Sequence, residues 1–150
     1  MSKRLVDRVY LSGSMTGVML EDQLRWRVWF ADALEDAGVY CYNPPAHFSP
    51  DYIDNTATDA SGYHDDREVM QYDLLQLAKS DLVIVNFDIG NKQSLGAMAE
   101  IAIAYSHRIP IIGICKDINT LHPWQRDMCE RILSSKEWAL AYLAMHYIGE

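Results

Sequence analysis

The sequence predicts an α/β protein with a flavodoxin-like, doubly wound parallel sheet of four or five strands and helices on both faces. Short apolar segments alternate with longer segments of helical periodicity, and this alternation is typical of a parallel sheet with connecting helices. The segment 82–87 is an apolar run without alternation, as expected of a strand that is covered on both faces. The 150 residues, 49% apolar and 23% charged, fit one domain spanning the chain.

The expected strands are short apolar runs that end at turn-forming residues. The run Val9–Gly13 leads into a Ser-Gly-Ser-Met-Thr-Gly loop, and a second run ends at Asn43-Pro44-Pro45. Residues 44–63 are rich in Pro, Asp, Asn, Ser and Thr and are predicted to form one loop, longer than compact domains ordinarily contain. Strands are predicted at residues 9–13, 39–42, 82–87 and 110–114.

Helical periodicity separates these strands. In the first helical segment, apolar residues recur at positions 20, 24, 28, 31 and 34, and Gly38 ends it. Arg25 and Arg27 lie on this helix, and we interpret them as part of a solvated face, although one of them could reach a phosphate. Helices are predicted at residues 20–37, 65–79, 94–107, 123–133 and 136–148.

The net charge limits the partners. Thirteen Lys and Arg residues against 21 Asp and Glu residues give a formal charge of −8, which argues against binding a nucleic acid polymer but allows a small anionic ligand. No apolar run approaches the roughly 20 residues that span a bilayer, and no signal peptide is recognisable. Three cysteines with long gaps and no Cys-His pattern predict a reduced, cytoplasmic protein without a metal site or membrane association.

Two carboxylates lie among apolar residues. Glu100 has only Gly, Ala and Ile three and four positions away, and Asp73 lies on or beside the apolar stripe of the preceding helix. Either could point outward into solvent. However, helices that flank the same strand (82–87) can bring both side chains to one edge of the sheet, and paired carboxylates suit the cleavage of an acetal-like bond.

Two segments could bind an anion at that edge, where ligands bind beyond the carboxyl ends of parallel strands. Ser94 begins the helix that carries Glu100, so its hydroxyl and the free N–H groups of the first turn could hold an anion, although a plain N-cap is an equal alternative. The loop Ser12–Gly17 offers hydroxyl groups and a permissive backbone, but it has neither the Walker A nor the G-x-G-x-x-G pattern.

Tyr10, the loop Ser12–Gly17, Asp73 and the segment SLGAMAEIAIAY at 94–105 together resemble the nucleoside 2-deoxyribosyltransferase superfamily, which includes 2'-deoxynucleoside 5'-monophosphate N-glycosidases. The resemblance implies that Glu100 attacks the anomeric carbon, that Asp73 assists the departure of the base and that Tyr10 orients Glu100. It implies no metal and no organic cofactor. The expected substrate-binding residues share the edge of the sheet: Ser12, Gly13, Ser14, Gly17, Asp88, Ser94 and Gly96.

Ser94 bears on the substrate. Six residues before the glutamate, the transferases of this superfamily carry aspartate and the monophosphate N-glycosidases carry serine. An aspartate would repel a phosphate, whereas a serine at a helix N-terminus attracts one. The sequence therefore favours N-glycosidic cleavage of a (deoxy)nucleoside 5'-monophosphate.

Two alternatives remain open: base exchange between nucleosides, and a non-catalytic nucleotide-binding sensor. In each case the partner is a small-molecule nucleotide or nucleoside. Apolar positions in the segments 123–133 and 136–148 further suggest a homodimer or a higher homo-oligomer.

Overall fold

The computed structural model describes residues 5–15, 17–48 and 66–149. These residues form one parallel sheet in the order β2-β1-β3-β4-β5. This is the flavodoxin-like order, in which the direction of winding reverses between β1 and β3, so the predicted fold class is confirmed. The strands are β1 (Arg8–Gly13), β2 (Tyr40–Tyr42), β3 (Leu82–Asn86), β4 (Ile111–Ile114) and β5 (Arg131–Leu133).

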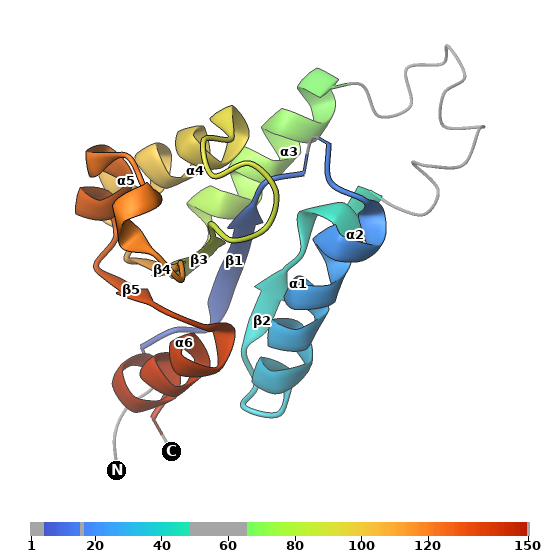
Figure 1. Cartoon of the computed structure of the whole chain (residues 1–150). Helices are drawn as coiled ribbons and strands as arrows, with labels where there is room; N and C mark the ends of the chain where they lie inside the picture. Colours follow the sequence, from blue (N-terminus) through green and yellow to red (C-terminus); the bar gives the residue numbers. More distant parts are fainter. Residues whose placement is uncertain (1–4, 16, 49–65, 150) are drawn as a thin grey trace.

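Helices cover both faces of the sheet (Figure 1). α1 and α6 lie on one side, and α3, α4 and α5 lie on the other. The first and last parts of the described chain lie side by side, where the Leu5 N–H donates to the Tyr147 carbonyl at 2.8 Å. None of the described helices is both long and apolar enough to cross a membrane. The helices are α1 (Leu20–Glu35), α2 (Pro44–Phe48), α3 (Asp66–Ala78), α4 (Leu95–Ser106), α5 (Pro123–Met128) and α6 (Lys136–Leu143), followed by the π-helical turn Ala144–Ile148.

Successive residues of β1 face opposite layers of the protein, as strand geometry requires. Val9 and Leu11 pack in the apolar cluster that contains the buried residues of α1 and α6. Tyr10 packs in the other cluster, with residues of α3 and α4. Because Ser12 lies two positions beyond Tyr10, its side chain also faces α4, and polar atoms of β1 thereby reach the functional side of the sheet.

The predicted helix 123–133 is wrong in its second half. α5 ends at Met128, and Arg131–Leu133 form the edge strand β5. Leu133 of β5 pairs with Ile114 of β4. Without β5, the backbone groups on the outer edge of β4 would have no strand partner, and this pairing outweighs the helical periodicity of the segment.

The predicted loop 44–63 begins instead with a helix. Pro44 starts α2, and proline is favoured at the first position of a helix because its missing N–H has no partner there. Residues 49–63 of the predicted loop lie outside the described residues. The other predicted strands and helices begin and end within two residues of the observed ones, except that the last helix changes to a π-helical turn after Leu143.

Candidate active site

β1 and α4 bring three of the predicted residues together at the carboxyl end of the sheet. The Tyr10 hydroxyl donates a hydrogen bond to Oε2 of Glu100, and the Ser12 hydroxyl donates to Oε1 at 2.7 Å. Glu100 itself is partly buried. Each carboxylate oxygen accepts one hydrogen bond from β1 and still has a lone pair for another partner. The Glu100 carboxylate is therefore held in a fixed orientation, and both of its oxygens can still accept another hydrogen bond or react.

A second carboxylate is held in the same manner. Asp73 on α3 is only 8% exposed, and its Oδ1 accepts a hydrogen bond from the Tyr42 hydroxyl at 2.7 Å. Tyr10 and Tyr42 are register partners on β1 and β2, and their ring centroids lie 5.5 Å apart. Two neighbouring tyrosines thus each hold one carboxylate, and the pairing of their strands places the two carboxylates in one cluster.

Burial changes the proton affinity of both carboxyl groups. It raises the pKa of Asp73 from 3.8 to about 7, against the Tyr42 hydrogen bond, which lowers it; the Glu100 charge raises it further and the Arg27 charge lowers it. Burial also raises the pKa of Glu100, while the hydrogen bonds from Tyr10 and Ser12 and the Arg27 charge lower it. A group whose pKa is near 7 can both give and accept a proton at neutral pH. Asp73 is therefore suited to proton transfer.

The interpretation of Arg27 as part of a solvated face is wrong. The residue is 0% exposed. Its guanidinium donates to the carbonyls of Gln23 at 2.7 Å and of Leu11 and Gly13 at 3.1 Å each. Burial lowers the pKa of Arg27 only to about 10, so the side chain remains charged at neutral pH. A cation therefore lies behind β1, in the electrostatic environment of both carboxylates.

The loops after β1 and β3 pack against each other. A Cβ at Gly13 would lie 3.0 Å from an indole carbon of α1, and Gly17 has a φ of +79°, which favours glycine. Gly90, in the second loop, has a φ of +69°, and a Cβ there would lie 2.9 Å from Oγ of the buried Ser14. The close approach of Gly90 to Ser14 therefore holds the two loops together at the carboxyl ends of β1 and β3.

Asp88 links two loops. Its carboxylate accepts a hydrogen bond from the Lys116 N–H at 3.0 Å, and Nζ of Lys92 lies 3.7 Å from it. Its own N–H donates to Oδ1 of Asn86 at 2.9 Å. These contacts tie the end of β3 to the end of β4. The prediction that Asp88 contacts a sugar hydroxyl stays a prediction.

Ser94 and Gly96 lie at the start of α4, six and four positions before Glu100. The Ser94 hydroxyl accepts a hydrogen bond from the Ala97 N–H at 3.4 Å, so Ser94 is the N-cap. Gly96 is exposed, and the nearest atom that a Cβ there would meet is the Ser94 Oγ at 4.0 Å. Leu95, between them, is 86% exposed. The first turn of α4 is therefore open to a small ligand.

Two residues of this cluster, Tyr42 and Arg27, were not predicted, although the sequence carries a signal for each. Tyr42 ends the second predicted strand, at the same edge as the end of the first. Arg27 falls at the helical spacing set by Leu20, Leu24 and Leu34, which places its side chain on the buried face of α1. Neither signal is specific without the sheet register or the carbonyl groups that receive the guanidinium.

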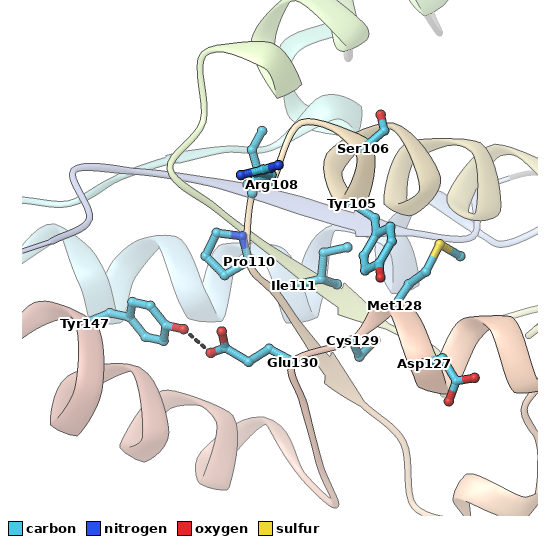
Figure 2. Close-up of a pocket in the computed structure, with 11 residues that line it drawn as sticks. Tyr105, Ser106, Arg108, Pro110, Ile111, Asp127, Met128, Cys129, Glu130 and Tyr147 are labelled. Carbon is cyan, nitrogen blue, oxygen red and sulfur yellow. Dashed lines mark hydrogen bonds between the residues drawn. The ribbon is translucent and has the colours of Figure 1, made fainter.

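A hollow of about 790 Å³ lies at the amino ends of the strands, away from Glu100. Figure 2 shows its lining, which includes Tyr105, Arg108, Glu130 and Tyr147, and none of the predicted site residues. Pro110 and Glu130 in this lining immediately precede β4 and β5, so the hollow is at the amino ends of these strands. Within the part of the chain that the structure describes, no three His, Cys, Asp or Glu side chains gather as a metal site would require.

Comparisons with known proteins identify the family and the fold. A family model described as nucleoside 2-deoxyribosyltransferase matches residues 9–141, whereas no curated protein matches the sequence. The solved structures that are similar in fold include the three described next. A conserved protein from Enterococcus faecalis V583 has a TM-score of 0.69 and 19% identity, over 89% of this chain and 94% of its own.

The other two structures have activities in their descriptions. A 2-deoxyribosyltransferase from Bacillus psychrosaccharolyticus has a TM-score of 0.66 and 15% identity, over 88% of this chain and 89% of its own. A CMP N-glycosidase from Clostridium botulinum has a TM-score of 0.59 and 17% identity, over 93% of this chain and 98% of its own. At these identities the similarity establishes the fold alone.

Proposed function

The chain belongs to the nucleoside 2-deoxyribosyltransferase family, and from this premise we propose that it cleaves the N-glycosidic bond of a nucleoside 5'-monophosphate and releases the free base. Members of the family are transferases or N-glycosidases, so the protein is an enzyme of one of these types. The observation that carries the proposal is the pair of hydrogen bonds from Tyr10 and Ser12 to Glu100, beside the Tyr42–Asp73 pair.

Glu100 is the nucleophile of the proposed reaction. One of its carboxylate oxygens forms a bond to the anomeric carbon while the bond from that carbon to the base nitrogen breaks, and the electron pair leaves with the base. Asp73 gives the base a proton, which its pKa of about 7 allows near neutral pH. Water then attacks the anomeric carbon, the bond to Glu100 breaks, and the proton released from water returns to Asp73.

The start of α4 supports a monophosphate as the substrate. Ser94 caps a helix of 12 residues, and the positive end of the helix dipole and the free N–H groups of its first turn favour an anion. The opening at Gly96 leaves room beside them. A phosphate bound at this turn would lie on the helix that also carries Glu100, so one element would position both the phosphate and the nucleophile.

The first test is a screen of the common nucleosides and their 5'-monophosphates for release of free base by chromatography, with and without a second free base. We expect hydrolysis of at least one monophosphate and little reaction of the matching nucleoside. Base exchange without net hydrolysis would show the transferase alternative instead. Binding by calorimetry without turnover of any nucleotide would show the sensor alternative.

A substitution at Ser94 tests the phosphate site. Ser94→Asp keeps a residue that caps helices well but places a negative charge where the phosphate is proposed to bind. We expect KM for the monophosphate to rise by about tenfold or more, since a close like charge costs on the order of 1–2 kcal/mol, with a smaller change for a nucleoside. Ser135→Asp is the matched control, because Ser135 caps α6 in the same manner away from the site. Equal KM values for the two variants would contradict the phosphate site.

The predicted homo-oligomer stays a proposal. It is supported by large apolar side chains that are exposed on α5 and α6, Trp124 and Trp138, since aromatic residues are enriched in interfaces between proteins. Sedimentation equilibrium of the purified protein would test it, and a monomer at micromolar concentration would contradict it.

A further inference from the structure

We propose that Arg27 is a positioning residue for the Glu100 carboxylate: it fixes the backbone on both sides of Ser12 and supplies a positive charge near the carboxylates of Glu100 and Asp73. The inference rests on the proposed role of Glu100 as the nucleophile. Arg27 itself touches neither the substrate nor the reacting atoms, because its side chain is enclosed in the protein.

The geometry of the backbone carries the first part. Nε of Arg27 donates to the Leu11 carbonyl and one terminal nitrogen donates to the Gly13 carbonyl, both at 3.1 Å. Ser12 lies between these two carbonyls, and its hydroxyl is the donor to Oε1 of Glu100 at 2.7 Å. The planar guanidinium thus holds the carbonyl groups of the two residues on either side of Ser12 in one fixed relation. A lysine has a single nitrogen in place of the planar fork, so it cannot hold both carbonyls in the same geometry.

The charge arrangement carries the second part. In the described part of the chain no carboxylate lies within ion-pair distance of Arg27, and the other nearby charges are at longer range: Glu100 on α4 and Asp73 on α3. Tyr10 and Tyr42 face the same cluster from β1 and β2 as neutral donors. α5 also packs on α4 and carries Arg126 and Asp127, but the charge that lowers the pKa of Glu100 is that of Arg27. Burying a cation without a contacting anion costs free energy. The negative charges of the two nearby carboxylates offset part of this cost.

A purely structural role for Arg27 makes a different prediction. If the guanidinium only filled the space between α1 and β1, its replacement would lower the free energy of unfolding but leave kcat of the folded protein and the ionisation of Glu100 unchanged. A positioning role requires both to change. The test therefore combines stability, kinetics and a titration that needs no turnover.

Arg27→Lys keeps the positive charge but loses the planar pair of donors that reaches the two carbonyls, and Arg27→Met loses both the charge and the donors. We expect kcat to fall by about tenfold or more in Arg27→Lys, since small displacements of a reacting group are costly, with KM within about threefold of wild type and a folded protein by circular dichroism. In Arg27→Met the titration of Glu100 should also move to higher pH, read from carboxyl ¹³C signals assigned with Glu100→Gln. Arg25→Met is the matched control on the same helix, because Arg25 is exposed and pairs with Glu21 and Asp22.

A double-mutant cycle tests the path through Ser12. In a Ser12→Ala background, Arg27→Lys should lower kcat by less than about threefold, because the hydroxyl that it positions is gone. If the fold-losses of kcat in Arg27→Lys and Ser12→Ala simply multiplied in the double variant, the proposed path through Ser12 would be overturned. Unchanged kcat and unchanged Glu100 titration in folded Arg27→Lys and Arg27→Met would overturn the whole inference.

A measurement on the unsubstituted site covers the case in which the Arg27 variants do not fold. The ¹⁵N–¹H signals of the Arg27 guanidinium should shift with pH as Glu100 ionises in the wild-type protein. Glu100→Gln should remove that part of the shift, and the part that remains there should come from Asp73 and be absent in Asp73→Asn. Absence of any pH response in the wild-type protein would overturn the coupling. An inactive wild-type protein whose signals still respond in this way would remove the proposed function and leave the coupling between Arg27 and Glu100 intact.

Discussion

Two tyrosine–glutamate pairs lie at opposite ends of the strands, one at the carboxyl ends and one at the amino ends, and they differ in their surroundings. At the carboxyl edge, Tyr10 donates to Glu100. At the amino edge, Tyr147 donates to Glu130, as the dashed line in Figure 2 shows. Glu130 is exposed, whereas Glu100 is partly buried and shares its cluster with Asp73 and Arg27. The hydrogen bond is the same in both pairs.

The comparison shows that the tyrosine–carboxylate contact alone does not make a reactive group. At Glu100, burial opposes ionisation while two donors and a buried cation favour it, so the carboxylate is poorly solvated and firmly oriented. Weak solvation and fixed orientation are the properties that a carboxylate nucleophile needs. Substitutions in the Tyr147–Glu130 pair therefore provide controls within the same chain for substitutions in the Tyr10–Glu100 pair.

The largest expected effect separates the two glutamates. Glu100→Gln removes the proposed nucleophile and should lower kcat for base release by about a thousandfold or more, while the protein stays folded because the amide is nearly isosteric. Glu130→Gln should leave kcat within about twofold of wild type. Chromatography of released base measures both. Parent-rate turnover in Glu100→Gln would falsify the assignment of this residue.

The next effect concerns the proton on Asp73. Asp73→Asn keeps an acceptor for the Tyr42 hydroxyl but cannot donate the proton, so kcat should fall by about a hundredfold. In the wild-type protein the acid form is active, and kcat should therefore decrease as the pH rises through about 7, the pKa to which burial raises Asp73. This decrease should be absent in Asp73→Asn. A kcat profile with the same basic limb in both proteins would assign the limb to another group.

Most of the fold could be predicted from the sequence because it follows local rules. Apolar runs and helical periodicity located the strands β1 to β4 and the helices α1, α3, α4 and α6, and Ser94 caps α4 as the sequence predicted. The strand β5 could not be predicted, since Arg131–Leu133 become a strand only through pairing with the edge of β4. That pairing depends on the assembled sheet.

The residues of the candidate site also fall into those that the sequence predicts and those that it does not. Tyr10, Asp73 and Glu100 were found from unusual residue types in apolar segments and from the family resemblance. Tyr42 depends on the register that places it beside Tyr10, and Arg27 depends on the carbonyls of Leu11 and Gly13. Partners that are distant in sequence are set by the folded geometry, and one sequence does not reveal them.

A smaller effect compares the two tyrosines. Tyr10→Phe removes one hydrogen bond to a charged group, which contributes about 1.5–3 kcal/mol, so kcat should fall by roughly tenfold to a hundredfold. Tyr147→Phe removes the same bond from an exposed carboxylate and should leave kcat unchanged. Steady-state kinetics of the two variants tests the comparison directly. Equal losses would mean that the tyrosines act through overall stability and not through the nucleophile.

The smallest expected effect is on stability, and its sign follows from the raised pKa of Asp73. The folded state holds this proton up to about pH 7, whereas an unfolded aspartate loses it near pH 4. The stabilising contribution of the protonated group is therefore complete at low pH and is lost as the pH rises through 7. Asp73→Asn should thus be more stable than wild type at pH 8, by at most about 4 kcal/mol for a shift of this size, and the difference should shrink toward pH 4. Urea unfolding at several pH values measures this difference, with Glu130→Gln as the exposed control. A difference that does not depend on pH would mean that Asp73 is solvated in the folded protein, and its proposed role as the proton donor at neutral pH would then lose its physical basis.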